Sequence, residues 1–175
     1  PLAERGQALL NMPDIDEQTL AGALGTATHG TGQDIGCMSS FVEEVQLIAA
    51  NGDMIDCSRT KNREIFDAAR VNLGAIGVVT QIKMQNMPKY RLKREPTWMP
   101  IEEILTNVDQ LASNNRNLEF YYIPVTGMGL IDIQNFTDEH VSIGEKLDQN
   151  DGAEDLKLAR DMLQWSPKLR ELVLG

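Results

Sequence analysis

The stretch Gly25–Gly32 combines three glycines, three threonines and one of the two histidines of the chain within eight residues. Glycines let a backbone adopt positive φ and approach a ligand closely, so that successive N–H groups can face one anion. Threonine hydroxyls add hydrogen-bond donors without charge. Just before this run, Thr19 can cap a short helical turn whose positive end also favours phosphate oxygens. The pattern predicts a phosphate-binding loop, although it lacks the lysine of a Walker loop and the spacing of a Rossmann fingerprint, so that by spacing alone a glycine-rich surface turn is the alternative.

Two further stretches follow the glycine-rich run in a fixed order. The first is Ser40–Val45 through Ala50–Asp53, and the second is Asn72–Thr80. Together with Met12–Ala23 and Thr26–Gly32, these stretches resemble the second half of the flavin-binding domain in the vanillyl-alcohol oxidase superfamily. Within that superfamily the chain is most similar to the aldonolactone oxidase branch, which includes gulonolactone, arabinonolactone and alditol oxidases. The resemblance covers about the first ninety residues.

This resemblance implies FAD as the cofactor and assigns cofactor roles to individual residues. Asn11 corresponds to the position where the family approaches the flavin ring, and Ala27 stands where many members have glycine. Backbone groups near Ile76–Val79 correspond to those that meet the adenine end. His29 is either a general base or a hydrogen-bonding group of the cofactor loop, and we assign it to the cofactor. The predicted cofactor-binding residues are Asn11, Thr19, Gly22, Gly25, Thr26, Ala27, Thr28, His29, Gly30, Thr31, Ile76, Gly77, Val78 and Val79. No catalytic residue and no metal ligand is predicted.

The order of expected elements predicts an α+β fold in two parts. Helices are expected over Leu2–Leu10, over 63–71 with Asn62 as its cap, over 101–112 and over 153–174. Strands are expected over 41–49 and 54–58, which form a hairpin around the Asn51-Gly52 turn, and over 78–84, 118–125 and 129–136. Prolines and a basic cluster at 88–100 mark the boundary and an edge strand. Residues 1–89 then form the C-terminal half of an FAD-binding domain, and residues 90–175 form the N-terminal part of a substrate or cap domain.

Composition argues against several classes of partner and site. A net charge of −10 argues against nucleic acid as a partner, because phosphates need Lys and Arg. The sequence contains no run of eighteen apolar residues, so no membrane-spanning segment is predicted. Cys37 and Cys57 lack a metal-ligand pattern and are interpreted as two buried thiols. The chain starts without Met, so we expect it to be a piece that lacks an N-terminal FAD subdomain. Such a piece should expose apolar surface and could form a homo-oligomer. We also expect a cytoplasmic location.

The resemblance predicts part of an FAD-dependent oxidoreductase that oxidises a sugar-derived lactone or a polyol. Hydride passes to the flavin and the electrons then pass to oxygen or another acceptor, while the piece alone is inactive. Two alternatives stay open. The same flavin fold could act on another alcohol, an amine or a hydroxy acid, or the chain could be a non-catalytic module that binds a partner protein.

Overall fold

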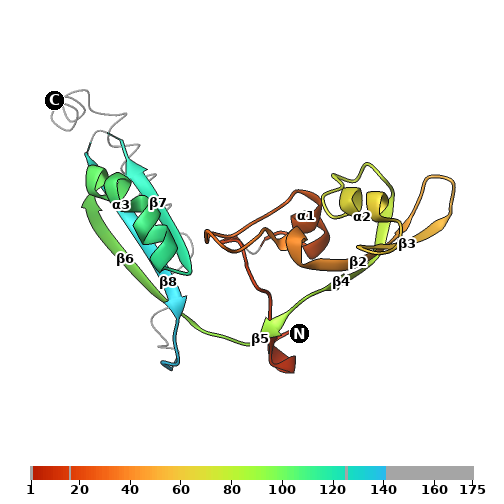
Figure 1. The fold of residues 1–175 in the computed structure, drawn as a ribbon, viewed down its shortest axis with the longest axis horizontal. Coiled ribbons are helices and arrows are strands. Elements are labelled where there is room, and N and C mark those ends of the chain that lie inside the picture. Colours follow the sequence, from red (N-terminus) through yellow and green to blue (C-terminus); the bar gives the residue numbers. More distant parts are fainter. Residues whose placement is uncertain (1, 16, 125, 141–175) are drawn as a thin grey trace. The chain divides into compact units, whose positions relative to one another are not determined.

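The computed structural model describes residues 2–15, 17–124 and 126–140, and the chain divides into two compact units (Figure 1). Unit 1 comprises Pro1–Tyr90 together with Ala112–Asn117, and unit 2 comprises Arg91–Leu111 and the residues from Leu118 onward. Each unit combines helices with antiparallel strands, which confirms the α+β class. The helix predicted over 153–174 lies outside the described residues.

The start of unit 1 differs from the prediction of a helix over Leu2–Leu10. A 3₁₀ helix covers only Ala3–Arg5, and strand β1 (Gln7–Ala8) follows it. β1 pairs antiparallel with β5 (Met87–Pro88), with Gln7 opposite Pro88. The helix prediction was wrong because a partner strand almost eighty positions away in the sequence supplies the hydrogen bonds, and local periodicity carries no information about that partner.

A three-stranded antiparallel sheet is the frame of unit 1. Its order is β3 (Met54–Ser58), β2 (Val42–Ile48) and β4 (Val78–Met84). β2 and β3 form the predicted hairpin, with Ile48 opposite Met54, and β4 pairs with the other edge of β2. The predicted hairpin and the predicted strand over 78–84 are confirmed, and β2 is the central strand.

Two short helices cover one face of this sheet (Figure 1). They are α1 (Leu20–Gly25) and α2 (Arg63–Ala69), and a 3₁₀ helix over Met38–Phe41 leads into β2. Phe66 of α2 is fully buried and packs with residues of α1 and β2. Burying a phenylalanine side chain contributes about 1.5–3 kcal/mol, so the face between helices and sheet is where unit 1 gains its stability.

Two predictions for this region need correction. Asn62 lies at the N-cap position of α2, but its Nδ2 donates to the Asp56 carbonyl at 2.9 Å and no side-chain cap forms. Cys57 is buried in β3 as predicted, whereas Cys37 is only partly buried. The Asn62 backbone is left-handed, with φ of 50°, rather than extended as in a side-chain cap, and the carbonyl of Asp56 within β3 holds its amide group.

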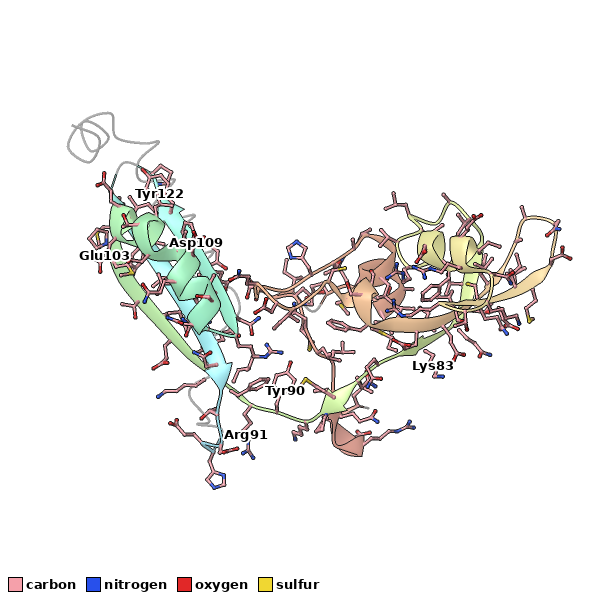
Figure 2. All side chains as sticks on the ribbon, viewed as in Figure 1. Lys83, Tyr90, Arg91, Glu103, Asp109 and Tyr122 are labelled. Carbon is pink, nitrogen blue, oxygen red and sulfur yellow. The ribbon has the colours of Figure 1, made fainter. Side chains whose placement is uncertain are left out.

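Unit 2 is a second three-stranded antiparallel sheet with one helix along a face (Figure 1). The strand order is β6 (Leu92–Pro100), β8 (Met128–Phe136) and β7 (Asn117–Ile123), so the predicted edge strand is confirmed as β6. Helix α3 (Ile101–Asn114) buries Ile104 completely. A Cβ at Gly129 of β8 would lie 2.7 Å from Ile104 Cδ1, so the glycine allows the helix to lie close to the sheet. Figure 2 shows Glu103 and Asp109 on this helix.

Candidate functional site

The glycine-rich run continues directly from α1. The Thr19 hydroxyl caps this six-residue helix by accepting a hydrogen bond from the Gly22 N–H at 3.2 Å, as predicted. At the other end, the N–H groups of Thr26, Ala27 and Thr28 donate to carbonyls of α1. These three amides therefore close the helix C-terminus, and the hydroxyl groups of Thr26 and Thr28 already donate to the Gly22 carbonyl and to Gln18 Oε1.

Ala27 has a left-handed backbone conformation, with φ of 58°. An L-residue other than glycine rarely adopts this conformation, which costs alanine roughly 1–2 kcal/mol. The strain falls at the position where the resembled family often has glycine. The backbone path of the loop is thus the one that a glycine would favour, and Ala27 follows it at a cost.

The second predicted stretch joins the first through a backbone hydrogen bond. The Leu73 N–H donates to the Gly25 carbonyl at 3.1 Å, and the Asn72 side chain holds the turn by accepting from the Gly74 N–H at 2.7 Å. The chain then enters β4 through Gly77, whose φ is 136°. Two segments fifty residues apart in the sequence therefore form one structure.

A cavity of about 370 Å³ opens between these two segments. Its size lies within the range of small-molecule sites, which is roughly 300–1,000 Å³. Gly22, Gly25 and Thr26 line it from the α1 side, and Gly77 and Val79 line it from the β4 side. The structure thus brings together five of the fourteen predicted cofactor residues in one concave surface. The other lining residues are Ala21, Leu24, Val42, Val45, Ala69, Arg70, Asn72, Leu73, Gly74 and Ile82.

Arg70 is the charged side chain of this lining, among the described residues. Its Nη2 donates to Asp67 Oδ1 at 2.8 Å, and its guanidinium lies 5.2 Å from the centre of the Phe66 ring. Its Nε is buried and has no hydrogen-bond partner among the described residues. A buried donor without a partner costs about 1–3 kcal/mol, more for a charged group, and the guanidinium to which Nε belongs is the positive charge that the cavity wall offers to an anionic ligand. Arg70 was not predicted from the sequence, although an arginine shortly before the Asn72–Thr80 stretch was the available signal.

The remaining predicted residues lie outside the lining of this cavity. Asn11 is buried and its Nδ2 lies 3.3 Å from the carbonyl oxygens of both Thr31 and Gly36. Thr28 donates to Gln18 Oε1 at 3.0 Å, and the exposed His29 donates from Nδ1 to the Gly30 carbonyl at 2.9 Å. A Cβ at Gly30 would lie 2.1 Å from the Met12 carbonyl oxygen. Outside the cavity lining are Asn11, Thr19, Ala27, Thr28, His29, Gly30, Thr31, Ile76 and Val78.

In the described part of the chain, no three His, Cys, Asp or Glu side chains lie close enough together to hold a metal ion. No helix among these residues is long and apolar enough to cross a membrane.

The architecture is similar to that of a flavoprotein oxidase. A structure of cholesterol oxidase from Brevibacterium sterolicum matches 98% of this chain and 38% of its own, with a TM-score of 0.71 and 16% sequence identity. A second structure of that enzyme matches 77% of this chain with a TM-score of 0.66. At this identity the likeness concerns the fold alone, and the fold is that of FAD-binding oxidases.

Sequence comparison identifies the relatives more narrowly. The chain is 32% identical to L-gulonolactone oxidase of Bos taurus over 123 residues, 33% identical to L-gulono-1,4-lactone dehydrogenase of Mycobacterium tuberculosis over 138 residues, and 30% identical to D-arabinono-1,4-lactone oxidase of Debaryomyces hansenii over 126 residues. These matches cover 70%, 79% and 72% of this chain but 28%, 32% and 23% of the respective relatives. No model of a protein family matches the sequence. The chain is therefore homologous to aldonolactone oxidases and dehydrogenases over less than a third of their length, which confirms the predicted resemblance.

Proposed function

We propose that unit 1 is the cofactor-binding part of an FAD-dependent oxidoreductase of the aldonolactone oxidase type. The observation that carries the proposal is the cavity in which Gly22, Gly25 and Thr26 meet Gly77 and Val79, with Arg70 Nε unpartnered in its wall. The lactone oxidases and dehydrogenases among the relatives support the same assignment.

The lining suits the adenosine diphosphate half of FAD. Glycine positions such as Gly22 and Gly25 keep the wall free of side chains, and Leu24 and Val79 present apolar surface to a flat base. Arg70 supplies the positive charge for a pyrophosphate, because a guanidinium donates charge-assisted hydrogen bonds to phosphate oxygens. The Thr26 hydroxyl already donates to the Gly22 carbonyl at 2.9 Å and keeps an acceptor lone pair.

When bound, the flavin ring supplies the redox chemistry: it accepts a hydride from a carbinol carbon, and the electrons then pass to oxygen or another acceptor. The residues of this chain bind and orient the cofactor. Asn11, held by two backbone carbonyls, is the residue we assign to the neighbourhood of the flavin ring. Thr19, Ala27–Thr31, Ile76 and Val78 complete the proposed set by fixing the backbone on either side of the cavity.

The substrate that we propose is a sugar-derived lactone or a polyol, since the relatives are named for such lactones. Because the chain spans 28% of the bovine relative, we assign the substrate-side groups and the rest of the cofactor surroundings to a further FAD subdomain and to other parts of an intact enzyme. A cytoplasmic location and a homo-oligomer complete the proposal.

A cofactor titration of the full chain tests the site. The Arg70→Met variant should bind FAD about 10–100-fold more weakly than the wild type, because a hydrogen bond to a charged group contributes about 1.5–3 kcal/mol. Arg63→Met is the matched control, since Arg63 also pairs with Asp67, at 3.2 Å, but does not line the cavity. Quenching of flavin fluorescence measures both affinities.

If neither the chain alone nor the chain combined with the proposed further FAD subdomain bound FAD, the proposed function would be refuted. Equal losses in Arg70→Met and Arg63→Met would instead show that Asp67 pairing, and not a contact with the cofactor, explains the effect.

A further inference from the structure

Four side chains of unit 1 donate hydrogen bonds to backbone carbonyls that lie before, within and after the predicted cofactor loop Gly25–Gly32. They are Asn11, Tyr90, Arg116 and Asn117; Arg116 lies between α3 and β7, and Asn117 is the first residue of β7. The acceptors are the carbonyls of Leu9, Leu10, Thr31 and Gly36. We call these four donors the carbonyl clamp. Backbone carbonyls outside sheets and helices need such partners, so the clamp determines the path of the loop.

Thr31 is bound by two members of the carbonyl clamp at once. Its carbonyl oxygen accepts from Asn117 Nδ2 at 2.6 Å and from Asn11 Nδ2 at 3.3 Å. The exposed fraction is 2% for Asn11 and 6% for Asn117. Buried polar side chains are stable where their hydrogen bonds are made, so both amides hold the Thr31 carbonyl in place.

Arg116 determines which way the Asn117 amide faces. Its Nη1 donates to Asn117 Oδ1, which directs Asn117 Nδ2 toward Thr31. Its Nη2 donates to the Leu10 carbonyl at 2.5 Å. The Arg116 guanidinium lies 5.0 Å from the centre of the Tyr90 ring, and the Tyr90 hydroxyl donates to the Leu9 carbonyl at 3.0 Å. Tyr90 is labelled in Figure 2 on the chain after β5.

The backbone around Gly30 and Gly32 is closely packed against neighbouring segments. A Cβ added at Gly32 would lie 2.7 Å from the Arg116 carbonyl oxygen, so the loop and the 112–117 segment lie in direct contact within unit 1. Two residues before Gly32, Gly30 lies against Met12 and Asn11 in the same way. The segment 112–117 therefore belongs to the support of the loop, although more than eighty residues separate them in the sequence.

We propose that Arg116 and Asn117 are positioning residues that hold the Asn11–Thr31 segment in the conformation required for binding the cofactor. The ligand in this inference rests on the proposed function, whereas the anchoring of the segment does not. Neither residue is expected to contact reacting atoms. Their effect passes through Thr31 and Leu10 to the predicted cofactor residues between them.

Hydrogen exchange of the full chain without cofactor tests the anchoring. In Asn117→Ala the amides of the Asn11–Thr31 segment should exchange about tenfold faster than in the wild type, because two hydrogen bonds are lost. Amides of α2 and of β2 should keep their wild-type rates. Asn107→Ala is the matched control, since Asn107 also donates from Nδ2 to a carbonyl, that of Glu103, but lies exposed on α3.

A second variant keeps the test informative if Asn117→Ala does not fold. Arg116→Lys retains the charge but lacks the planar guanidinium that donates to Leu10 and Asn117 together. It should therefore speed local exchange, but less than Asn117→Ala does. Both variants should also raise the dissociation constant for FAD, by about tenfold for Asn117→Ala, because a smaller fraction of molecules has a binding-competent loop.

The outcomes separate the two proposals. Unchanged exchange in both variants, or acceleration spread equally over α2 and β2, overturns the anchoring role. Faster local exchange with an FAD affinity equal to that of the wild type overturns the positioning role. If FAD binds neither to the wild-type chain nor to that chain combined with the proposed further FAD subdomain, the proposed function is refuted, and local exchange then decides the anchoring by itself.

Discussion

Replacing Gly77 by alanine should destabilise unit 1 strongly and close part of the cavity wall. Gly77 has φ of 136°, and a Cβ there would lie 2.4 Å from the Ile48 carbonyl oxygen. Ile48 belongs to the central strand β2 and is paired with Met54 on one side and with Val78 on the other. The carbonyl therefore cannot move away without breaking pairs in both directions.

The magnitude follows from two contributions. An alanine in a sparsely populated backbone region costs about 1–3 kcal/mol, and an added methyl group without space costs about 1–3 kcal/mol more, which together gives roughly 2–6 kcal/mol. Gly74→Ala is the matched control, because Gly74 also lines the cavity and has φ of 74°, but a Cβ there meets nothing within 4 Å. This control should cost only the strain of a left-handed alanine, about 1–2 kcal/mol.

Urea unfolding followed by circular dichroism measures both variants against the wild type. The free energy of unfolding should fall in both, and by at least about 1 kcal/mol more in Gly77→Ala. Equal losses in the two variants would refute the reasoning, since the contact with Ile48 would then contribute nothing. A Gly77→Ala chain that does not fold would agree with the upper end of the estimate, because small domains have only about 5–15 kcal/mol of stability.

Three further predictions concern the loop, the thiols and the surface. Ala27→Gly should raise the free energy of unfolding by up to about 1 kcal/mol, and with it the thermal midpoint, because relief of the left-handed strain exceeds the entropy cost of glycine. A lower midpoint would contradict the strain inferred from the φ of 58°. The Ser40 hydroxyl, 3.3 Å from Cys37 Sγ, lowers the pKa of Cys37, whereas burial and the nearby Asp56 raise the pKa of Cys57. Iodoacetamide should therefore modify Cys37 first and at a lower pH, and Ser40→Ala should shift this reaction to higher pH; preferential labelling of Cys57 would show the assignment to be wrong. Exposed apolar side chains such as Leu73 and Val78 predict self-association, which sedimentation at several concentrations detects and a monomer at all of them excludes.

Local sequence signals were sufficient for elements whose hydrogen bonds are made within the element or across a tight turn. The hairpin of β2 and β3, the helices α2 and α3, and the Thr19 cap all agree with the prediction. Prediction failed at the first ten residues, where the partner strand is distant in the sequence, and at the Asn62 cap, where the partner is a carbonyl within the neighbouring strand β3. The same limit explains why Arg70 was missed.

Residue types and their spacing were enough to predict the α+β class, the order of the motifs and the relationship to aldonolactone oxidases. The folded arrangement was needed to show which predicted residues share a cavity, that Arg70 lies in its wall, and that Arg116 and Asn117 donate to the carbonyls of Leu10 and Thr31. These contacts depend on how separate segments pack, and the energy of packing is distributed over many side chains that no short motif records.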